Sequence, residues 1–242
     1  PVPRVATALA LADRIGAAAV RCGFGRNRCT IAPGLYAVGA ASADSPVLVT
    51  ANYKLTFDTL RRELAGVDAW VLVLDTRGVN VWCAAGKNLF SHDELALRVQ
   101  RAGLERVVRH RRLILPQLAA TGVSARQVKK KCVFEVVWGP VRARDIHDFL
   151  RNGMQAEQAM RRVTFTFGER LVLVPVELSF LPKPTAVILA ALFLISGIGA
   201  GIFSADTAWA RGLSAAAAYA AGVLAGAVAT PALLPWIPGR AF

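Results

Sequence analysis

The chain has 242 residues, of which 55% are hydrophobic and 19% are charged, and its 29 Lys and Arg against 16 Asp and Glu give a formal net charge of +13. This composition excludes a disordered tail and a collagen-like fibre, and four cysteines are too few for a disulfide-stapled mini-protein. The length predicts one folded domain and an additional segment.

Charge is unevenly distributed along the chain. Residues 183–242 contain only Lys183, Arg211 and Arg240 as bases and Asp206 as an acid. The charged part, residues 1–182, is therefore expected to be a soluble basic domain, and residues 183–242 a membrane domain.

Two uncharged runs lie in that C-terminal segment. Thr185–Phe203 is 19 residues long, and a helix needs about 20 apolar residues to cross the hydrocarbon of a bilayer. The run from 212 to 234 is richer in alanine and ends near Pro235. We expect two transmembrane helices, at about 185–203 and 212–234.

The distribution of bases predicts the location of the domain. Many Lys and Arg precede Pro182 and resist translocation, and the N-terminus has no continuous apolar run typical of a secretory signal. We expect a multi-pass protein of the inner, cytoplasmic membrane with its soluble domain on the cytoplasmic face. The four cysteines, which form no CxxC pair, are then reduced and do not indicate a zinc knuckle.

Short β-rich runs alternate with helical patterns in residues 1–182. The apolar run Ala69–Leu74 is typical of a strand buried on both faces, and a capping box at Ser91 and Glu94 predicts a helix through Arg101. The other expected strands are 46–49, 106–108, 113–115, 133–137 and 171–176, and the other expected helices are 57–65 with Thr56 as its cap, 127–131 and 144–150. The alternation predicts a Rossmann-like, doubly wound α/β domain, whose ligands bind beyond the carboxyl ends of the strands.

Nucleotide-binding motifs are incomplete in this chain. Gly23-x-Gly25 is followed by Arg28 where a dinucleotide fingerprint needs its third glycine. Gly86-Lys87 lacks the upstream glycine and the following Ser or Thr of a P-loop.

One segment directly after the buried strand carries candidate chemistry. Asn80 is a good N-cap, which places Cys83 at the third helical position, where unpaired backbone N–H groups favour a thiolate. Accessible thiolates bind metals or react. The alternative is that Cys83 is a small apolar packing residue, the usual role of a free cysteine.

The string Asn-Val-Trp-Cys-Ala-Ala-Gly-Lys at 80–87 resembles the cap-helix motif of the HgcA family, the membrane-anchored corrinoid proteins of mercury methylation. Further segments that resemble this family are 1–5, 33–36, 44–54, 110–117 and 161–165. The resemblance implies a corrinoid-binding domain similar to that of the large subunit of the corrinoid iron–sulfur protein. It also implies a membrane domain longer than two helices, of which 183–242 would be a part.

The resemblance further implies an activity. Cys83 would be the lower axial ligand of cobalt in a base-off corrinoid, and methyl-Co(III) would transfer its methyl group to Hg(II), producing methylmercury. Electrons would come from the ferredoxin HgcB, and the methyl group from methyltetrahydrofolate-linked metabolism. Two alternatives stay open: a corrinoid methyl carrier with a different physiological acceptor, and a non-catalytic binding module.

Candidate corrinoid contacts come from the cap helix and from loops at the expected strand ends. Small residues at 84–86 would let a flat macrocycle approach, Trp82 would pack or stack, and Lys87 would meet a corrin amide or solvent. The full set is Asn80, Val81, Trp82, Cys83, Ala84, Ala85, Gly86, Lys87, Thr50, Asn52, Asp75, Thr76, Gln117 and Gly139.

The basic charge, including the run Lys129–Lys131, favours an anionic membrane surface and an acidic ferredoxin as partners. Membrane lipid is therefore expected and nucleic acid is not, because the chain has no aromatic and basic RNA-binding motif.

Overall fold

The computed structural model describes residues 2–237. The chain divides into two compact units. The first unit is Pro1–Ala17 with Asn27–Val163, and the second is Ala18–Arg26 with Thr164–Phe242. The division falls before the boundary at Pro182 that the charge distribution predicts, since residues 164–181 associate with the C-terminal helices.

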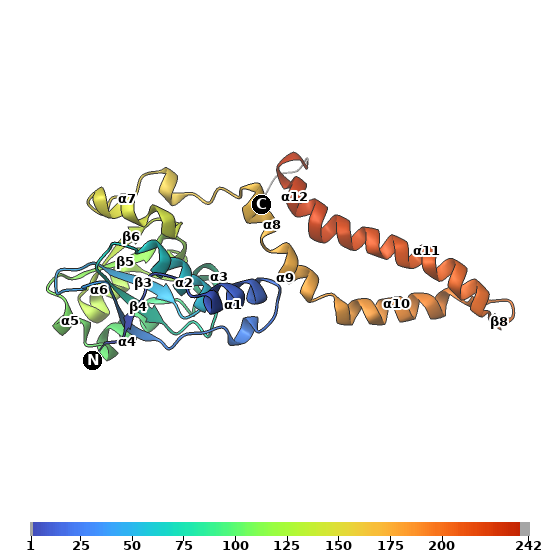
Figure 1. Cartoon of the computed structure of the whole chain (residues 1–242), viewed down its shortest axis with the longest axis horizontal. Helices are drawn as coiled ribbons and strands as arrows, with labels where there is room; N and C mark the ends of the chain where they lie inside the picture. Colours follow the sequence, from blue (N-terminus) through green and yellow to red (C-terminus); the bar gives the residue numbers. More distant parts are fainter. Residues whose placement is uncertain (1, 238–242) are drawn as a thin grey trace. The chain divides into compact units, whose positions relative to one another are not determined.

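A six-stranded sheet forms the centre of the first unit (Figure 1). Its order is β1-β2-β4-β3-β5-β6, and every neighbouring pair is parallel except β2 with β4. The strands are β1 (Arg4–Val5), β2 (Gly34–Val38), β3 (Val47–Ala51), β4 (Ala69–Leu74), β5 (Arg112–Pro116) and β6 (Glu135–Gly139).

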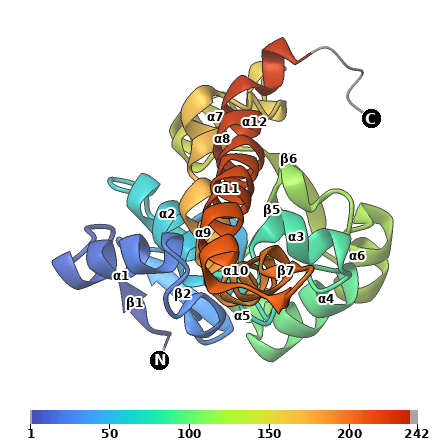
Figure 2. The same ribbon diagram turned by 90° about the vertical axis from the view of Figure 1, so that its right-hand side faces the viewer.

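Helices cover both faces of this sheet. One face carries α2 (Lys54–Glu63) and α7 (Ile146–Arg151). The other carries α3 (Val81–Gly86), α4 (His92–Arg101), α5 (Leu104–Val107) and α6 (Ala125–Cys132). In Figure 2, α4 and α6 lie side by side. The expected doubly wound α/β architecture is confirmed at the level of a mostly parallel sheet between two helical layers.

Alternating side chains of the central strands build the two cores. In β4, Leu72 and Leu74 pack in the core below α4 and α6, while Val71 and Val73 pack with α2 and α7. This confirms the prediction that Ala69–Leu74 is a strand buried on both faces, since period-two alternation gives each face an apolar row.

The strand order reverses between β3 and β5. From β3 the chain crosses to β4 on one side, and after α4 and α5 it returns to β5 on the other side of β3. Among the described residues β3 pairs with β5 only at Leu48–Ile114, whereas β3 with β4 and β5 with β6 each pair over five residues. The carboxyl ends of β3 and β5 therefore form the topological switch point at which such folds bind ligands.

Two predictions in the first unit are wrong. Residues 106–108, expected as a strand, begin inside α5, which follows Gly103 in a left-handed conformation at φ 57°. Thr56 does not cap α2, because that helix begins at Lys54 after the N-cap Tyr53. The remaining expected strands and helices of this unit occur with shifts of a few residues at their ends.

The second unit is helical. It contains α8 (Phe167–Leu171), α9 (Val174–Ser179), α10 (Pro182–Ser196), α11 (Ala205–Leu224) and α12 (Thr230–Leu233), with a small hairpin of β7 (Ile198–Gly199) and β8 (Ile202–Phe203) between α10 and α11. The predicted strand 171–176 is therefore wrong, because α8 and α9 occupy these residues.

The predicted continuous helix 185–203 is also wrong, because α10 ends at Ser196. A side chain at Gly197 would come within 2.2 Å of the Phe203 ring, and the Gly197 carbonyl accepts the Ser204 backbone N–H. Glycine at this position lets the hairpin fold back onto the end of α10.

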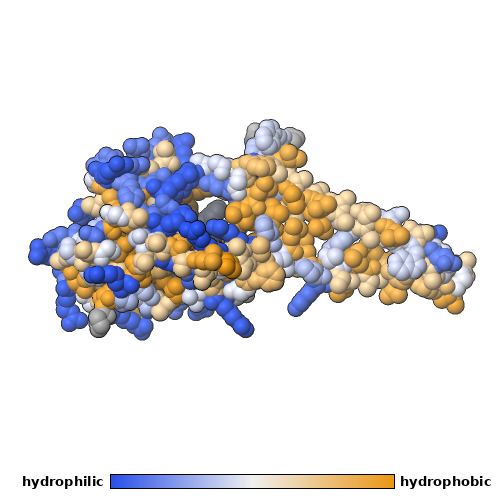
Figure 3. Space-filling model, in the orientation of Figure 1, coloured by the Kyte–Doolittle hydropathy of each residue, from blue (hydrophilic) through white to orange (hydrophobic). Residues whose placement is uncertain are grey.

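One helical stretch, Ala205–Trp236, has the length and apolar composition needed to cross a membrane. A second candidate is the pair 167–179 and 182–196, which bends by 60° at its break. In Figure 3, orange hydrophobic atoms cover much of α10 and α11. The second expected helix, 212–234, lies inside the longer apolar stretch.

Polar contacts join the segments of the second unit. The Thr185 and Tyr219 hydroxyls lie 2.7 Å apart and link α10 to α11. The Arg170 guanidinium donates to the carbonyls of Pro231 and Ala232 at 2.9 and 3.1 Å. These bonds explain why α8 belongs to this unit.

Candidate functional site

The cap segment begins as the sequence predicts. The Asn80 side-chain oxygen accepts the Cys83 backbone N–H at 2.9 Å, so Asn80 is the N-cap of α3. Cys83 is exposed, and the interpretation of this residue as buried packing is therefore wrong. Because α3 is only six residues long, the helix dipole acting on the thiol is smaller than that of a long helix.

The faces of α3 have different surroundings. Val81, Ala84 and Ala85 are buried in the core, so the two alanines hold the helix against the domain. Trp82 is 53% exposed. Cys83, Gly86 and Lys87 are exposed as well, and any flat ligand that reaches the thiol meets this outer face.

Gly122, in the turn after β5, supports α3 from below. A side chain at this glycine would lie 2.5 Å from the Phe90 carbonyl oxygen and 2.8 Å from the Ala85 Cα. The Ala84 carbonyl also accepts the backbone N–H groups of Leu89 and Phe90 at 2.8 and 3.1 Å. The cap helix is thus held by close backbone packing at its buried face.

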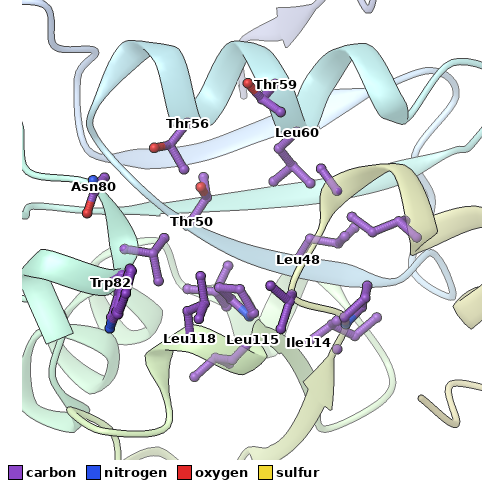
Figure 4. A pocket seen from close by; sticks show the side chains of 18 of the residues that line it. Leu48, Thr50, Thr56, Thr59, Leu60, Asn80, Trp82, Ile114, Leu115 and Leu118 are labelled. Carbon is purple, nitrogen blue, oxygen red and sulfur yellow. The ribbon is translucent and has the colours of Figure 1, made fainter. Parts of the chain in front are cut away.

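A cavity of about 380 Å³ opens at the switch point, beside α3 (Figure 4). Asn80 and Trp82 lie at one end, Thr56, Thr59 and Leu60 of α2 form a wall, and Leu115 and Leu118 lie opposite. Cys83 does not line the cavity among the described residues, but it directly follows Trp82, which does. The remaining lining residues are Leu48, Val49, Thr50, Tyr53, Leu55, Val81, Ile114, Pro116, Gly139, Pro140, Val141, Ala143 and Ile146.

The predicted loop residues divide into two groups. Thr50 and Gly139 line the cavity. Asn52, Asp75 and Thr76 do not: Asn52 and Thr76 are buried and hydrogen-bonded to the loop before α3, whereas Asp75 is exposed. The hydrogen bonds of these three residues therefore shape the loop that precedes α3.

Gln117 follows β5 in a short 3-10 helix that contacts α3. Its side-chain oxygen is buried and has no hydrogen-bond partner in the described part of the chain. A buried carbonyl oxygen without a donor is costly, and Gln117 is not among the described residues that line the cavity.

The other cysteines lie in different surroundings. Burial raises the pKa of the Cys29 and Cys132 thiols, and the Cys132 sulfur donates to the Val128 carbonyl. Cys22 is exposed. In residues 2–237 no group of three or more His, Cys, Asp or Glu could hold a metal ion, so a bound metal would have to bring most of its ligands with it.

Sequence reasoning missed the α2 wall, namely Thr56 and Thr59. The available signal was positional: α2 follows β3, and a helix beside a switch-point strand borders the ligand site of such a fold. The helix was expected to begin at residue 57 with Thr56 as its cap, so neither Thr56 nor Thr59 was assigned to the ligand site.

Comparison with known proteins now identifies the family. The family described as CO dehydrogenase/acetyl-CoA synthase delta subunit matches residues 26–150, just over half of the chain. The chain belongs to this family. The matched segment contains the whole cavity lining and the cap helix.

Curated proteins to which the chain is similar include gamma subunits of the acetyl-CoA decarbonylase/synthase complex. The chain is 32% identical to that of Methanocaldococcus jannaschii over 129 residues, 52% of this chain and 26% of that protein. It is 35% identical to the gamma subunit of Methanosarcina acetivorans over 99 residues, which are 39% of this chain and 21% of that protein. It is 36% identical to the gamma subunit of Methanopyrus kandleri over 92 residues, which are 37% of this chain and 20% of that protein. The chain therefore spans about a quarter or less of these relatives.

These matches correct the assignment made from the motif at 80–87. The relationship that they show is to the CO dehydrogenase/acetyl-CoA synthase delta subunit family and to the gamma subunits, and not to the HgcA family specifically. An eight-residue motif and short flanking segments indicated the right fold but overstated how narrowly the family could be defined.

Proposed function

We propose that the first unit is a corrinoid-binding methyl carrier with Cys83 as the protein ligand of cobalt, and that it serves a methyltransferase reaction. The observation that carries this proposal is an exposed thiol on a capped helix next to a cavity at the switch point of a mostly parallel sheet. Membership of a family named for acetyl-CoA synthase subunits supports it, since that chemistry assembles a methyl group into acetyl-CoA.

The residues present fit a corrinoid. The cavity is mainly apolar, as suits a macrocycle edge or its tail, and the threonines at 50, 56 and 59 place hydroxyls among its lining side chains. Cys83 is accessible, whereas Cys132 is buried.

When bound, the corrinoid supplies a methyl group on cobalt that can be passed to an acceptor. The protein residues bind and orient it. Asn80 and the buried faces of Ala84 and Ala85 hold α3, the α3 backbone presents the Cys83 sulfur, and Trp82 covers one end of the cavity. A thiolate donates electron density strongly to a metal, so Cys83 would make the cobalt that it holds more electron-rich.

The family carries more information about the methyl acceptor than the candidate site does. The relatives' names favour a metabolic acceptor of an acetyl-CoA-forming system. Hg(II) is a second candidate substrate, favoured by the accessible thiol, since a methyl group that leaves with its electron pair suits a soft, electrophilic ion.

We further propose a low-potential iron–sulfur protein as the electron donor, because returning cobalt to its reactive state needs electrons and the described residues hold no cysteine cluster of their own. Methyltetrahydrofolate-linked metabolism is the proposed methyl source.

The second unit is the proposed membrane anchor, with the first unit on the cytoplasmic face. The long apolar stretch Ala205–Trp236 supports this proposal. Extraction of membranes with alkaline carbonate tests it: the chain should stay in the pellet, and release into the supernatant would overturn the anchor.

The function is tested by refolding the full chain in detergent with methylated corrinoid under anaerobic conditions. Wild type is compared with Cys83→Ala and with Cys22→Ala, which removes another exposed thiol. Wild type and Cys22→Ala should retain corrinoid with a sulfur-ligated absorption spectrum, and Cys83→Ala should lose that spectrum. Equal spectra in all three would overturn the proposed ligand. Incubation with Hg(II), or with the acetyl-CoA-forming partner subunits, then identifies the acceptor.

A further inference from the structure

The loop that leads into the cap helix is organised around one buried side chain. Asn52 follows β3 and is 5% exposed. Its side-chain oxygen accepts the backbone N–H groups of Thr76 and Gly78 at 3.0 and 2.9 Å. Residues 75–79 join β4 to Asn80, so a residue at the end of one strand holds the loop that follows its neighbour.

Those two backbone donors fix the orientation of the Asn52 amide. The oxygen must face them, which directs the amide nitrogen toward Asp75, where it donates to the carboxylate at 3.2 Å. The same carboxylate oxygen accepts the Arg77 backbone N–H at 3.0 Å. The Asn52–Asp75 contact therefore has a defined polarity, with an amide donor and a carboxylate acceptor.

The loop needs this support. Arg77 and Gly78 both adopt left-handed conformations, at φ 54° and 74°, and a non-glycine residue there is strained. Thr76 is fully buried and its hydroxyl lies 2.6 Å from the Val79 carbonyl oxygen, to which it donates. The loop thus ends in a fixed geometry one residue before the N-cap of α3.

A second contact holds the start of the same loop. The Glu94 carboxylate accepts the Asp75 backbone N–H at 2.8 Å and the Arg98 guanidinium N–H at 2.8 Å. This contact fixes where the loop leaves β4. The part that turns into the cap helix, Thr76 to Gly78, is held by Asn52.

We propose that Asn52 is a positioning residue that sets the place of the Cys83 thiol through the loop 75–79. The inference rests on the proposed function for its meaning. Asn52 does not line the cavity among the described residues, so it acts on the site through the loop and not by contact with a ligand.

Exchanging the donor and acceptor tests this assignment. Asn52→Asp keeps an oxygen for the two backbone N–H groups but places two carboxylates against each other at Asp75, which repel. Asp75→Asn alone is the matched control, because its amide oxygen still accepts from Asn52. The double variant Asn52→Asp with Asp75→Asn removes the repulsion and lets the amide of residue 75 donate to the carboxylate of residue 52, although that nitrogen cannot accept the Arg77 N–H as the Asp75 oxygen does.

Two readouts are measured on the full chain. Without corrinoid, amide hydrogen exchange of residues 81–87 should be about tenfold faster in Asn52→Asp, near wild type in Asp75→Asn, and slower in the double variant than in Asn52→Asp, with the exchange of α4 unchanged in all three. With corrinoid, the sulfur-ligated fraction should fall and recover in the same order.

Unchanged exchange and ligation in Asn52→Asp would overturn the inference, and so would a double variant that folds but exchanges as fast as Asn52→Asp. If wild type itself shows no sulfur ligation, the proposed function fails, while exchange without corrinoid still decides whether Asn52 positions the cap helix. If Asn52→Asp does not fold, the double variant decides the question. Folding of the double variant supports the inference, and its failure to fold overturns it.

Discussion

The Asn80 side-chain oxygen accepts the backbone N–H of Cys83 at 2.9 Å, so the residue that begins the cap helix is bonded to the residue that carries the exposed thiol. The cap therefore fixes the Cys83 backbone directly. Changes at Asn80 should therefore reach the thiol through the backbone of α3.

Asn80→Ala should remove this cap and destabilise α3 by about 1 kcal/mol, whereas Asn80→Ser retains a cap oxygen. We expect weaker corrinoid retention in the alanine variant, by about fivefold, and nearly normal retention in the serine variant. Titration with corrinoid followed by absorption measures both. Equal weakening by serine and alanine would show that Asn80 acts through ligand contact and not through the cap.

Gly122→Ala should destabilise the first unit, because the new methyl group would clash with the Phe90 carbonyl oxygen and the Ala85 Cα. Overpacking of this kind costs about 1–3 kcal/mol. The control is Gly86→Ala, whose new methyl group would meet no described atom within 4 Å outside its own stretch of helix, and helix propensity favours alanine there. Chemical denaturation compares the two, and equal free energies of unfolding would contradict the close packing beneath α3.

Thr59→Phe should fill part of the cavity from α2. Thr59 is exposed, and among the described residues its hydroxyl donates only to the Leu55 carbonyl within the same helix, so the fold should tolerate the change. We expect corrinoid retention to fall by about tenfold or more, with Thr59→Val as a control that adds no ring. Normal retention by a folded Thr59→Phe chain would mean that the corrinoid binds elsewhere.

Asp13→Asn should reduce stability in a pH-dependent way. The Lys54 ammonium at 2.7 Å, and the Arg61 guanidinium at 2.8 Å, lower the pKa of Asp13 from 3.8 to about 2. A depressed folded-state pKa gives stability that is present above 3.8 and is lost as the pH falls through about 2.

The expected loss is about 1–2 kcal/mol at neutral pH, reduced by partial solvent screening, and it should shrink toward pH 2. Unfolding curves at several pH values measure it. Asp44→Asn, which breaks an exposed pair with Arg109, should have little effect at any pH. A loss of stability in Asp13→Asn that is constant from neutral pH to pH 2 would rule out the ion pairs as its cause.

The sequence revealed the parts of the fold that depend on local patterns. Ala69–Leu74 has matching apolar faces, and Ser91 and Asn80 have the side chains that cap helices, so these elements occur where they were predicted. Glu94 differs: its carboxylate bonds to the Asp75 backbone N–H, a partner far away in the sequence. The segments 106–108 and 171–176 lie largely in helices and not in strands, which shows that β propensity alone does not decide the structure of a short apolar run.

The candidate site was predictable in part. Cys83 stands out in the sequence because its motif is local, and its exposure agrees with the proposed ligand role, which stays a prediction. The role of Asn52 was not, since its partners at Thr76 and Gly78 meet it only when β3 and β4 pair. The α2 wall was missed for the same reason.

The central claim is that Cys83 is the protein ligand of the corrinoid cobalt. Cobalt X-ray absorption on the corrinoid-loaded full chain tests it most directly. Wild type should show a sulfur scatterer bound to cobalt, and Cys83→Ser should retain the cofactor but show only nitrogen and oxygen neighbours. A sulfur scatterer that persists in Cys83→Ser, or one that is absent from a wild-type chain with corrinoid bound, would contradict the claim.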